Sequence, residues 1–390
     1  MIKTKTQVFL ILALLIGLTI NIYSGFLLEE NSKQITELED VVAFEFMGDV
    51  NNIRNSKGGE WEATSENIQV AIDSLNGERG MVWVPGGKTY TIEPIVVKQD
   101  CILNLGFGTY IPNGDSDYMF SLEKGAGLWN GYINIENTGF DGTCVLIDGE
   151  DYKNMMTNRV RIYNLDLNSN SNVGTAFWFL CDGTGLQAIT MVELSHIRTR
   201  RFEYSIRMSS ITPYDGSSGC FINANDISHI WMNEDKYGIY IEDHHEEGVQ
   251  WDRSETSGNF FSDIYYQTPG GTYATYGSVI TINGGDYNVF DHIFVWDFLH
   301  APTGSMAFTV DENSISNTIF YRGAIENANI DNQGASTTFY RYGDQEAPPF
   351  IMKDANFDIY ESYNFYALVR AISYVMVIFS LIGLFITRRM

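Results

Sequence analysis

The sequence predicts an all-β fold in which the chain winds into a single-stranded parallel β-helix, a solenoid of stacked coils. The first observation is a phrase that recurs between residues 102 and 319: an apolar residue, a small or mixed residue, then Asn, His or Asp. Its copies begin 25 to 34 residues apart, as in a solenoid whose strands stay in register while its loops differ in length. The third position is occupied by Asn104, Asn130, Asn164, His196, His229, Asp263, His292 and Asn317.

A second phrase precedes most copies and is a short apolar strand that ends in an acid or an amide. These strands are rich in β-branched and aromatic residues, and their apolar residues alternate, so one face of each strand points inward. Two strands per repeat therefore predict coils of a parallel solenoid. The strands end at Glu123, Asp148, Asp243, Asn283 and Asp311.

The composition fits one large domain and narrows the range of partners. The chain has 390 residues, of which 44% are hydrophobic, and its formal net charge is −25. Nucleic acid needs a basic footprint, so this charge argues against it as a partner. A polyanionic substrate would need an intervening cation such as Ca²⁺.

The N-terminal segment, residues 1–28, is predicted to be a transmembrane anchor. Residues 8–28 are almost wholly apolar and long enough to span a bilayer, and Lys3 and Lys5 before them place the N-terminus in the cytoplasm. A cleaved signal peptide is the alternative, but no clear small-residue cleavage site follows. Residues 29–62 are acidic and mixed, and we interpret them as a stalk or linker.

Residues 64–75 predict an amphipathic helix at the start of the ectodomain. Thr64 or Ser65 is placed to cap it, and its apolar stripe consists of Ile68, Ala71, Ile72 and Leu75. The open end of a solenoid exposes its core, so a capping helix is physically required there.

The segment around this helix resembles a known superfamily. The pattern Ile68-Gln69-x-Ala71-Ile72-Asp73, followed by Pro85-Gly86-Gly87-x-x-Tyr90-x-Ile92, is similar to the opening of pectate-lyase-like right-handed β-helices. The resemblance covers residues from about 64 to 345. It implies right-handed coiling over residues 63–360 and, as in tailspikes, assembly into a trimer. The superfamily contains lyases, hydrolases and binding rods, so the resemblance does not fix a function. The usual Asp-Asp before the helix is replaced by Ala63-Thr64-Ser65-Glu66.

A second transmembrane helix is predicted within residues 363–390. Residues 367–386 are apolar, and Arg388 and Arg389 behind them place this end in the cytoplasm as well. The intervening β-helix is therefore expected on the outer side of a cell membrane or a virion envelope.

The polar third position of the recurring phrase predicts a column of stacked side chains at a turn. Such a column hydrogen-bonds from coil to coil and satisfies main-chain groups there, so its histidines are interpreted as structural rather than catalytic. The four cysteines fit no zinc spacing, and either packing in the core or bridging neighbouring coils accounts for them.

The densest group of titratable side chains follows the strand that ends at Asp243. Asp243, Glu247 and Asp252 are candidate catalytic residues for glycoside chemistry, and Asp243 and Glu246 are candidate Ca²⁺ ligands. The candidate ligand-binding residues are His244, His245, Trp251, Tyr265 and Tyr266. A solvated acidic loop and a set of core or interface aromatics are the alternatives for these two groups.

The leading functional hypothesis is a surface protein, either a virion spike or a cell-surface adhesin, that binds a host or neighbouring surface through its glycans or another surface receptor. The alternatives are a membrane-tethered polysaccharide lyase or glycoside hydrolase and a structural lattice protein. No catalytic motif of the resembled enzymes is found, and basic residues are scarce, with 24 Lys and Arg.

Overall fold

The computed structural model describes residues 51–342, apart from gaps at 115, 152–158, 171, 213–214, 216, 244–254, 268–276, 297, 299–304, 324 and 326–328. These residues belong to one compact unit, Asp49–Ala347. The two predicted transmembrane segments and most of the predicted stalk lie outside the described residues. Among the residues that are described, no helix is both long and apolar enough to cross a membrane.

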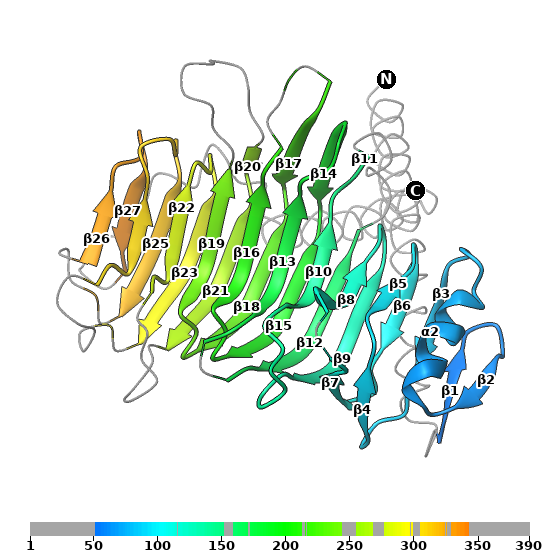
Figure 1. The fold of residues 1–390 in the computed structure, drawn as a ribbon. Helices are drawn as coiled ribbons and strands as arrows, with labels where there is room; N and C mark the ends of the chain where they lie inside the picture. Colours follow the sequence, from blue (N-terminus) through cyan, green and yellow to red (C-terminus); the bar gives the residue numbers. More distant parts are fainter. Residues whose placement is uncertain are drawn as a thin grey trace, which may run out of the picture. The chain divides into compact units, whose positions relative to one another are not determined.

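The described chain is mostly β-structure arranged in three sheets (Figure 1). The largest has 14 strands: β1 (Asn52–Asn55), β2 (Glu60–Glu62), β3 (Gly80–Trp83), β4 (Thr89–Ile92), β6 (Cys101–Asn104), β7 (Thr109–Pro112), β9 (Gly127–Asn134), β12 (Arg161–Asn168), β15 (Glu193–Arg200), β18 (Asp226–Asn233), β21 (Phe260–Gln267), β23 (Val289–Trp296), β25 (Thr318–Gly323) and β27 (Thr338–Arg341).

The second sheet has nine strands: β5 (Ile95–Val97), β8 (Tyr118–Leu122), β10 (Thr143–Asp148), β13 (Thr175–Cys181), β16 (Tyr204–Ser210), β19 (Tyr237–Asp243), β22 (Ile280–Asn283), β24 (Phe308–Val310) and β26 (Ile330–Asn332). The third has four: β11 (Glu150–Asp151), β14 (Leu186–Thr190), β17 (Gly219–Asn223) and β20 (Glu255–Ser257).

Apart from β1, β2 and β11, the strands pair in parallel with strands of neighbouring coils. In the largest sheet the order β9-β12-β15-β18-β21-β23-β25 follows the sequence, and the second sheet repeats this from β8 to β24. A chain that meets the same sheet once per repeat is winding into stacked coils, which is the arrangement expected of a β-helix. Antiparallel pairs occur at β1–β2, β1–β3 and β11–β14.

The core lies between the sheets and is built from like residues stacked in register. Ile162, Leu194, Ile227, Phe261 and Phe290 occupy equivalent positions on five successive strands, and each is at most 1% exposed. The rings of Phe261 and Phe290 stack with centroids 4.6 Å apart. Burying each such side chain contributes about 1.5–3 kcal/mol, so the repeat supplies its own cohesion.

All four cysteines, Cys101, Cys144, Cys181 and Cys220, are buried and carry free thiols. Their burial agrees with packing inside the solenoid, and it also leaves thiols of neighbouring coils in the same core. Free cysteine behaves as a small apolar residue in such a core.

Six long strands of the largest sheet bend at one left-handed residue. Asn130, Asn164, His196, His229, Asp263 and His292 have φ between 52° and 57°. Asn, Asp and His tolerate this region better than other residues with a Cβ, which explains the polar third position of the recurring phrase. We call these six residues the bend column. It confirms the predicted turn column for these members.

The two ends of the predicted column are placed differently. Asn104 is not left-handed, although it accepts a hydrogen bond from Asn130 Nδ2 at 3.4 Å. Asn317 is buried and belongs to another ladder, because Thr318 pairs with Val289 and this aligns Asn317 with Asn288, four residues before His292. Its assignment to the bend column was therefore wrong.

That second ladder consists of four buried asparagines on successive coils. The Nδ2 atom of Asn225 donates to Asn259 Oδ1 at 2.8 Å, Asn259 donates to Asn288 at 2.9 Å, and Asn288 donates to Asn317 at 3.1 Å. The same Nδ2 groups also donate to main-chain carbonyls, so the ladder satisfies backbone at each turn.

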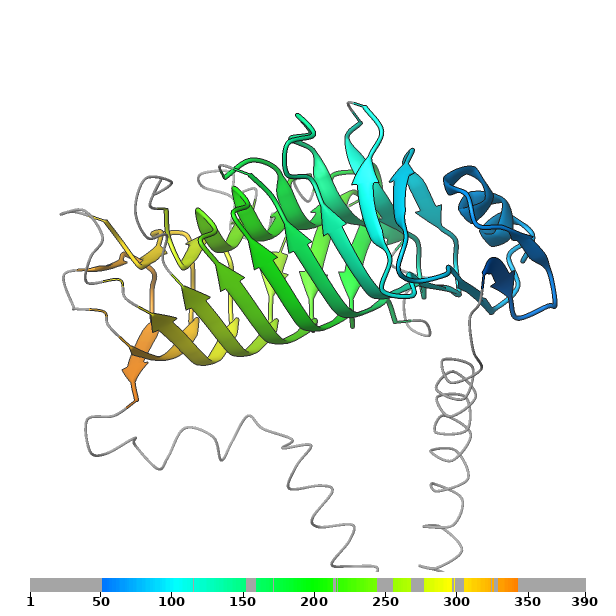
Figure 2. The same cartoon turned by 90° about the horizontal axis from the view of Figure 1, so that it is seen from below.

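Helix α2 (Ser65–Asp73) lies with the β1–β2 hairpin at the N-terminal end of the coils (Figure 2). It buries Ile68, Ala71 and Ile72 against the core, as its stripe predicts. Thr64 occupies the N-cap position but makes no capping hydrogen bond through its side chain. The helix therefore covers core residues at the end where the first coil has no preceding neighbour.

Candidate ligand-binding face

The outward face of the largest sheet carries a second in-register column, whose first six members each follow a bend-column residue by two positions and whose seventh continues the register on β25. Each member lies on the strand next to that of the previous member, so their side chains form one line across the sheet. We call this set the face column. Its members are Tyr132, Asp166, Arg198, Trp231, Tyr265, Phe294 and Arg322.

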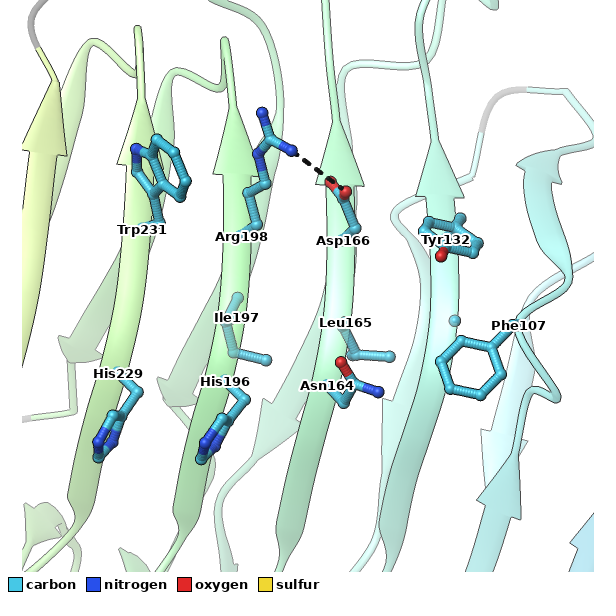
Figure 3. A pocket seen from close by; sticks show the side chains of 11 residues that line it. Phe107, Tyr132, Asn164, Leu165, Asp166, His196, Ile197, Arg198, His229 and Trp231 are labelled. Atoms are coloured by element: carbon cyan, nitrogen blue, oxygen red, sulfur yellow. Dashed lines mark ion pairs between the residues drawn. The ribbon is translucent and has the colours of Figure 1, made fainter. Parts of the chain in front are cut away.

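A pocket of about 330 Å³ lies along the first four strands of this face. Figure 3 shows its two sides: Asn164, His196 and His229 of the bend column form one row, and the face column forms the other. The left-handed bend turns two successive side chains outward on each strand, and this brings both rows to the surface. The complete lining is Phe107, Gly131, Tyr132, Asn164, Leu165, Asp166, His196, Ile197, Arg198, His229 and Trp231.

Large aromatic side chains are unusually exposed here. Tyr132, Trp231, Tyr265 and Trp296 are 45%, 48%, 44% and 63% exposed, and all four project from strands of the same sheet. A run of exposed aromatics on a rigid sheet is typical of an interaction site, because their apolar rings gain from being covered.

Charged groups are interleaved with the aromatics. Arg198 Nη1 lies 3.9 Å from Asp166 Oδ2, and the guanidinium group lies 5.1 Å from the centroid of Trp231. At this distance and exposure the ion pair contributes little to stability, so both groups are available to a ligand. Burial raises the pKa of the Asp166 carboxyl group, and the positive charges of Arg198 and Arg200 oppose this rise.

Two imidazoles line the pocket side by side. The rings of His196 and His229 stack with centroids 4.8 Å apart and planes 7° apart. Burial, and then the neighbouring His229, lower the pKa of His196. A neutral imidazole has one donor and one acceptor nitrogen, which suits recognition of hydroxyl groups.

Asp243, the predicted catalytic and metal-binding residue, is the last residue of β19 and lies away from this face. Its Oδ2 atom accepts a hydrogen bond from the Thr256 amide at 2.9 Å, while Oδ1 is buried without a partner among the described residues. Burial raises its pKa well above the usual range. It is held in the fold by the strand that follows the acidic segment.

The predicted line of strand-end carboxylates is displaced by one residue at this strand. Glu242, not Asp243, pairs with Asn283 of the next coil. Glu242 accepts hydrogen bonds from Arg207 Nη2 at 2.7 Å and from Ser209 Oγ. Its carboxylate is thus engaged by its own neighbours, and the residue in register with it on the next coil is an amide rather than a second carboxylate.

The other residues predicted from the acidic segment, His244, His245, Glu246, Glu247, Trp251 and Asp252, lie outside the described residues. Within the part of the chain that the structure describes, no three His, Cys, Asp or Glu side chains are grouped as metal ligands.

The two predicted ligand-binding tyrosines have opposite positions. Tyr265 is 44% exposed and belongs to the face column. Tyr266 is 1% exposed, and its hydroxyl donates to the carbonyl oxygen of Asp235 at 2.6 Å, so it is a core residue and does not reach a ligand. Strand alternation explains the difference.

Sequence reasoning missed Tyr132, Asp166 and the pocket itself. The signal was present, because each face residue follows its bend residue by two positions. Only the register between strands shows that these residues meet, and the loops between the repeats vary in length.

Comparisons with known proteins add little to this description. No protein-family model matches the chain, and no curated protein matches it. Among solved structures, ORF18 of Geobacillus virus E2 matches 71% of this chain at 12% sequence identity with a TM-score of 0.29. The chain spans 57% of that protein. A similarity at this TM-score supports no conclusion about fold or function.

Proposed function

We propose that this chain is a membrane-anchored surface protein, a spike or adhesin, whose β-helix lies outside the membrane and binds glycans. In this proposal the coils are right-handed, as in the pectate-lyase-like superfamily, and three copies assemble into a trimer. The observation that carries the proposal is the face column, with exposed aromatic rings and charged groups in one line beside a pocket of about 330 Å³.

The chemistry of the face suits a carbohydrate. Sugar rings present apolar faces that stack on Tyr and Trp and hydroxyl groups that pair with His, Asp, Asn and Arg. Neighbouring strands are about 4.8 Å apart, so an extended oligosaccharide lying across the strands contacts several coils at once. Trp231 and Tyr265 lie on adjacent strands and form the centre of this surface.

A polysaccharide lyase or hydrolase is the second candidate, and Asp166 is the observation that favours it. This carboxyl group lines the pocket with a raised pKa, near Arg198 and Arg200. Carboxyl groups with shifted pKa values in pockets serve as general acids or bases.

The test uses the purified full chain in detergent on a glycan array, with a parallel assay for unsaturated or reducing sugar ends. Binding without product is expected. Trp231→Ala is expected to weaken binding about 10-fold, the loss of one stacking contact. Tyr287→Ala is the matched control, because Tyr287 is 59% exposed and is not part of the pocket lining.

Other outcomes separate the alternatives. Product that disappears in Asp166→Asn identifies an enzyme. If Trp231→Ala binds glycans as well as the parent does, the face column is not the binding site. The absence of both binding and product favours a lattice role.

A further inference from the structure

We propose that Cys181 and Cys220 form a disulfide bond when the chain folds in an oxidising environment. The bond would join β13 of the second sheet to β17 of the third sheet, two strands that come from different turns of the chain (Figure 1).

Each cysteine pairs in register with a residue that contacts the other cysteine, and this brings the two thiols close together. Cys181 pairs in register with Ser210, whose Oγ donates to the carbonyl oxygen of Cys220 at 2.9 Å. Cys220 pairs in register with Gln187, whose Oε1 lies 3.9 Å from Cys181 Sγ. Strands β13 and β17 are in contact, and each of the two thiols shifts the pKa of the other.

The surroundings make one of these thiols reactive. Both cysteines are 0% exposed, so water does not compete for the contact. The hydrogen bond from Cys181 lowers the pKa of Cys220 to about 7, and Thr212 contributes to the same effect. The pKa of Cys181 is raised by the same hydrogen bond. Cys220 is therefore the attacking thiolate and Cys181 the resolving thiol.

The oxidant is a small disulfide such as oxidised glutathione. The Cys220 thiolate attacks one glutathione sulfur, forms a mixed disulfide and releases the first glutathione thiolate. Cys181 then loses its proton and attacks Cys220 Sγ, which releases the second glutathione. The protein loses two electrons and two protons, and the glutathione disulfide becomes two thiols. Because both sulfurs are buried in the finished fold, glutathione reaches Cys220 through a transient local opening of the otherwise native coils.

Cys101 and Cys144 provide an internal comparison. They lie in β6 and β10, and burial raises the pKa of both thiols, to about 12 for Cys101. Protonated, buried thiols are poor nucleophiles, so these two are expected to remain free.

The experiment folds the full chain in detergent with a mixture of oxidised and reduced glutathione, then alkylates the denatured protein and maps its peptides by mass spectrometry. One disulfide between Cys181 and Cys220 is expected, with alkylation at Cys101 and Cys144. Reduction is expected to lower the melting temperature by about 5 °C, because the cross-link restricts the unfolded chain.

Matched variants separate the bond from simple packing. Cys181→Ala and Cys220→Ala are expected to melt at the same temperature with and without reductant, while Cys144→Ala retains the parent's response. Four alkylated cysteines in the folded parent, or a disulfide at another pair, would overturn the proposal. The peptide map of the parent decides the question even where a variant does not fold.

Discussion

Asp235 is a carboxyl group buried inside the coil, in the turn between β18 and β19. Its Oδ2 accepts a hydrogen bond from Thr199 Oγ1 at 2.6 Å, and its Oδ1 accepts one from the Phe202 amide at 2.8 Å. Burial raises the pKa of Asp235 to about 7. The two hydrogen bonds oppose this rise, and the negative charge of the neighbouring Glu234 adds to it. The ionised form is thus disfavoured in the folded state.

A pH dependence of stability follows from this residue. Because the folded pKa lies above that of unfolded Asp, its contribution is complete below about pH 4 and is lost as the pH rises to about 7. The full loss is on the order of 4 kcal/mol. In urea unfolding, Asp235→Asn is expected to flatten the dependence of the free energy of unfolding on pH between about pH 4 and pH 7. The control Glu312→Gln changes an exposed carboxyl group and is expected to leave this dependence unchanged. Parallel profiles for parent and Asp235→Asn would contradict the prediction.

For individual residues, the sequence predicted which residue types occupy a position better than it predicted which residues pair with one another. The polar third position indicated a turn column, and six left-handed residues confirm it. The error at Asn317 arose because Ile319, and not Ile315, is the residue in register with Phe290, which the spacing of phrases cannot show. Glu242 and Asp243 are both acidic, so the pattern could not tell which of the two continues the column.

The buried asparagine ladder joins whole coils, and its strength is measurable at one member. The Oδ1 atom of Asn259 accepts hydrogen bonds from Asn225, and its Nδ2 atom donates to Asn288 Oδ1 and to the carbonyl oxygen of Ile222. Asn259→Ala leaves several of these buried groups without partners, at about 1–3 kcal/mol each. We expect a loss of at least about 3 kcal/mol in the free energy of unfolding by chemical denaturation.

The control for this element is an asparagine at the surface. Asn313 is exposed and donates only to Asp311 at 3.2 Å among the described contacts, so Asn313→Ala should change stability by less than about 0.5 kcal/mol. Similar losses in both variants would mean that the ladder does not hold the coils together. The ladder had a signal in the sequence: Asn225, Asn259 and Asn288 each precede the recurring phrase by two positions.

The charge of the whole molecule favours cation binding. With 49 acidic and 24 basic side chains, the chain repels itself at neutral pH, and added salt should raise its melting temperature. A specific Ca²⁺ site at Asp243 and Glu246, still a prediction, would add stability beyond this general screening.

The two effects separate at constant ionic strength. If Asp243 and Glu246 hold Ca²⁺, a Ca²⁺ chelator lowers the melting temperature of the parent by several degrees, and Asp243→Asn abolishes this response while the effect of NaCl persists. An unchanged melting temperature on chelation would leave the acidic segment as a solvated loop. The stacking of coils was predictable from the phrase, whereas the pocket depends on side-chain register that no local pattern contains.

The regular register has a consequence for protein engineering, because the molecule can be shortened by whole units. Removing residues 226–259 would bring Asn225 against Asn288 and His196 against Asp263, so the asparagine ladder and the bend column would each close with an equivalent partner. The product would be one coil shorter, by about 4.8 Å. In a molecule of this kind, the number of coils sets the length of the stack, and the asparagine ladder marks the successive coils.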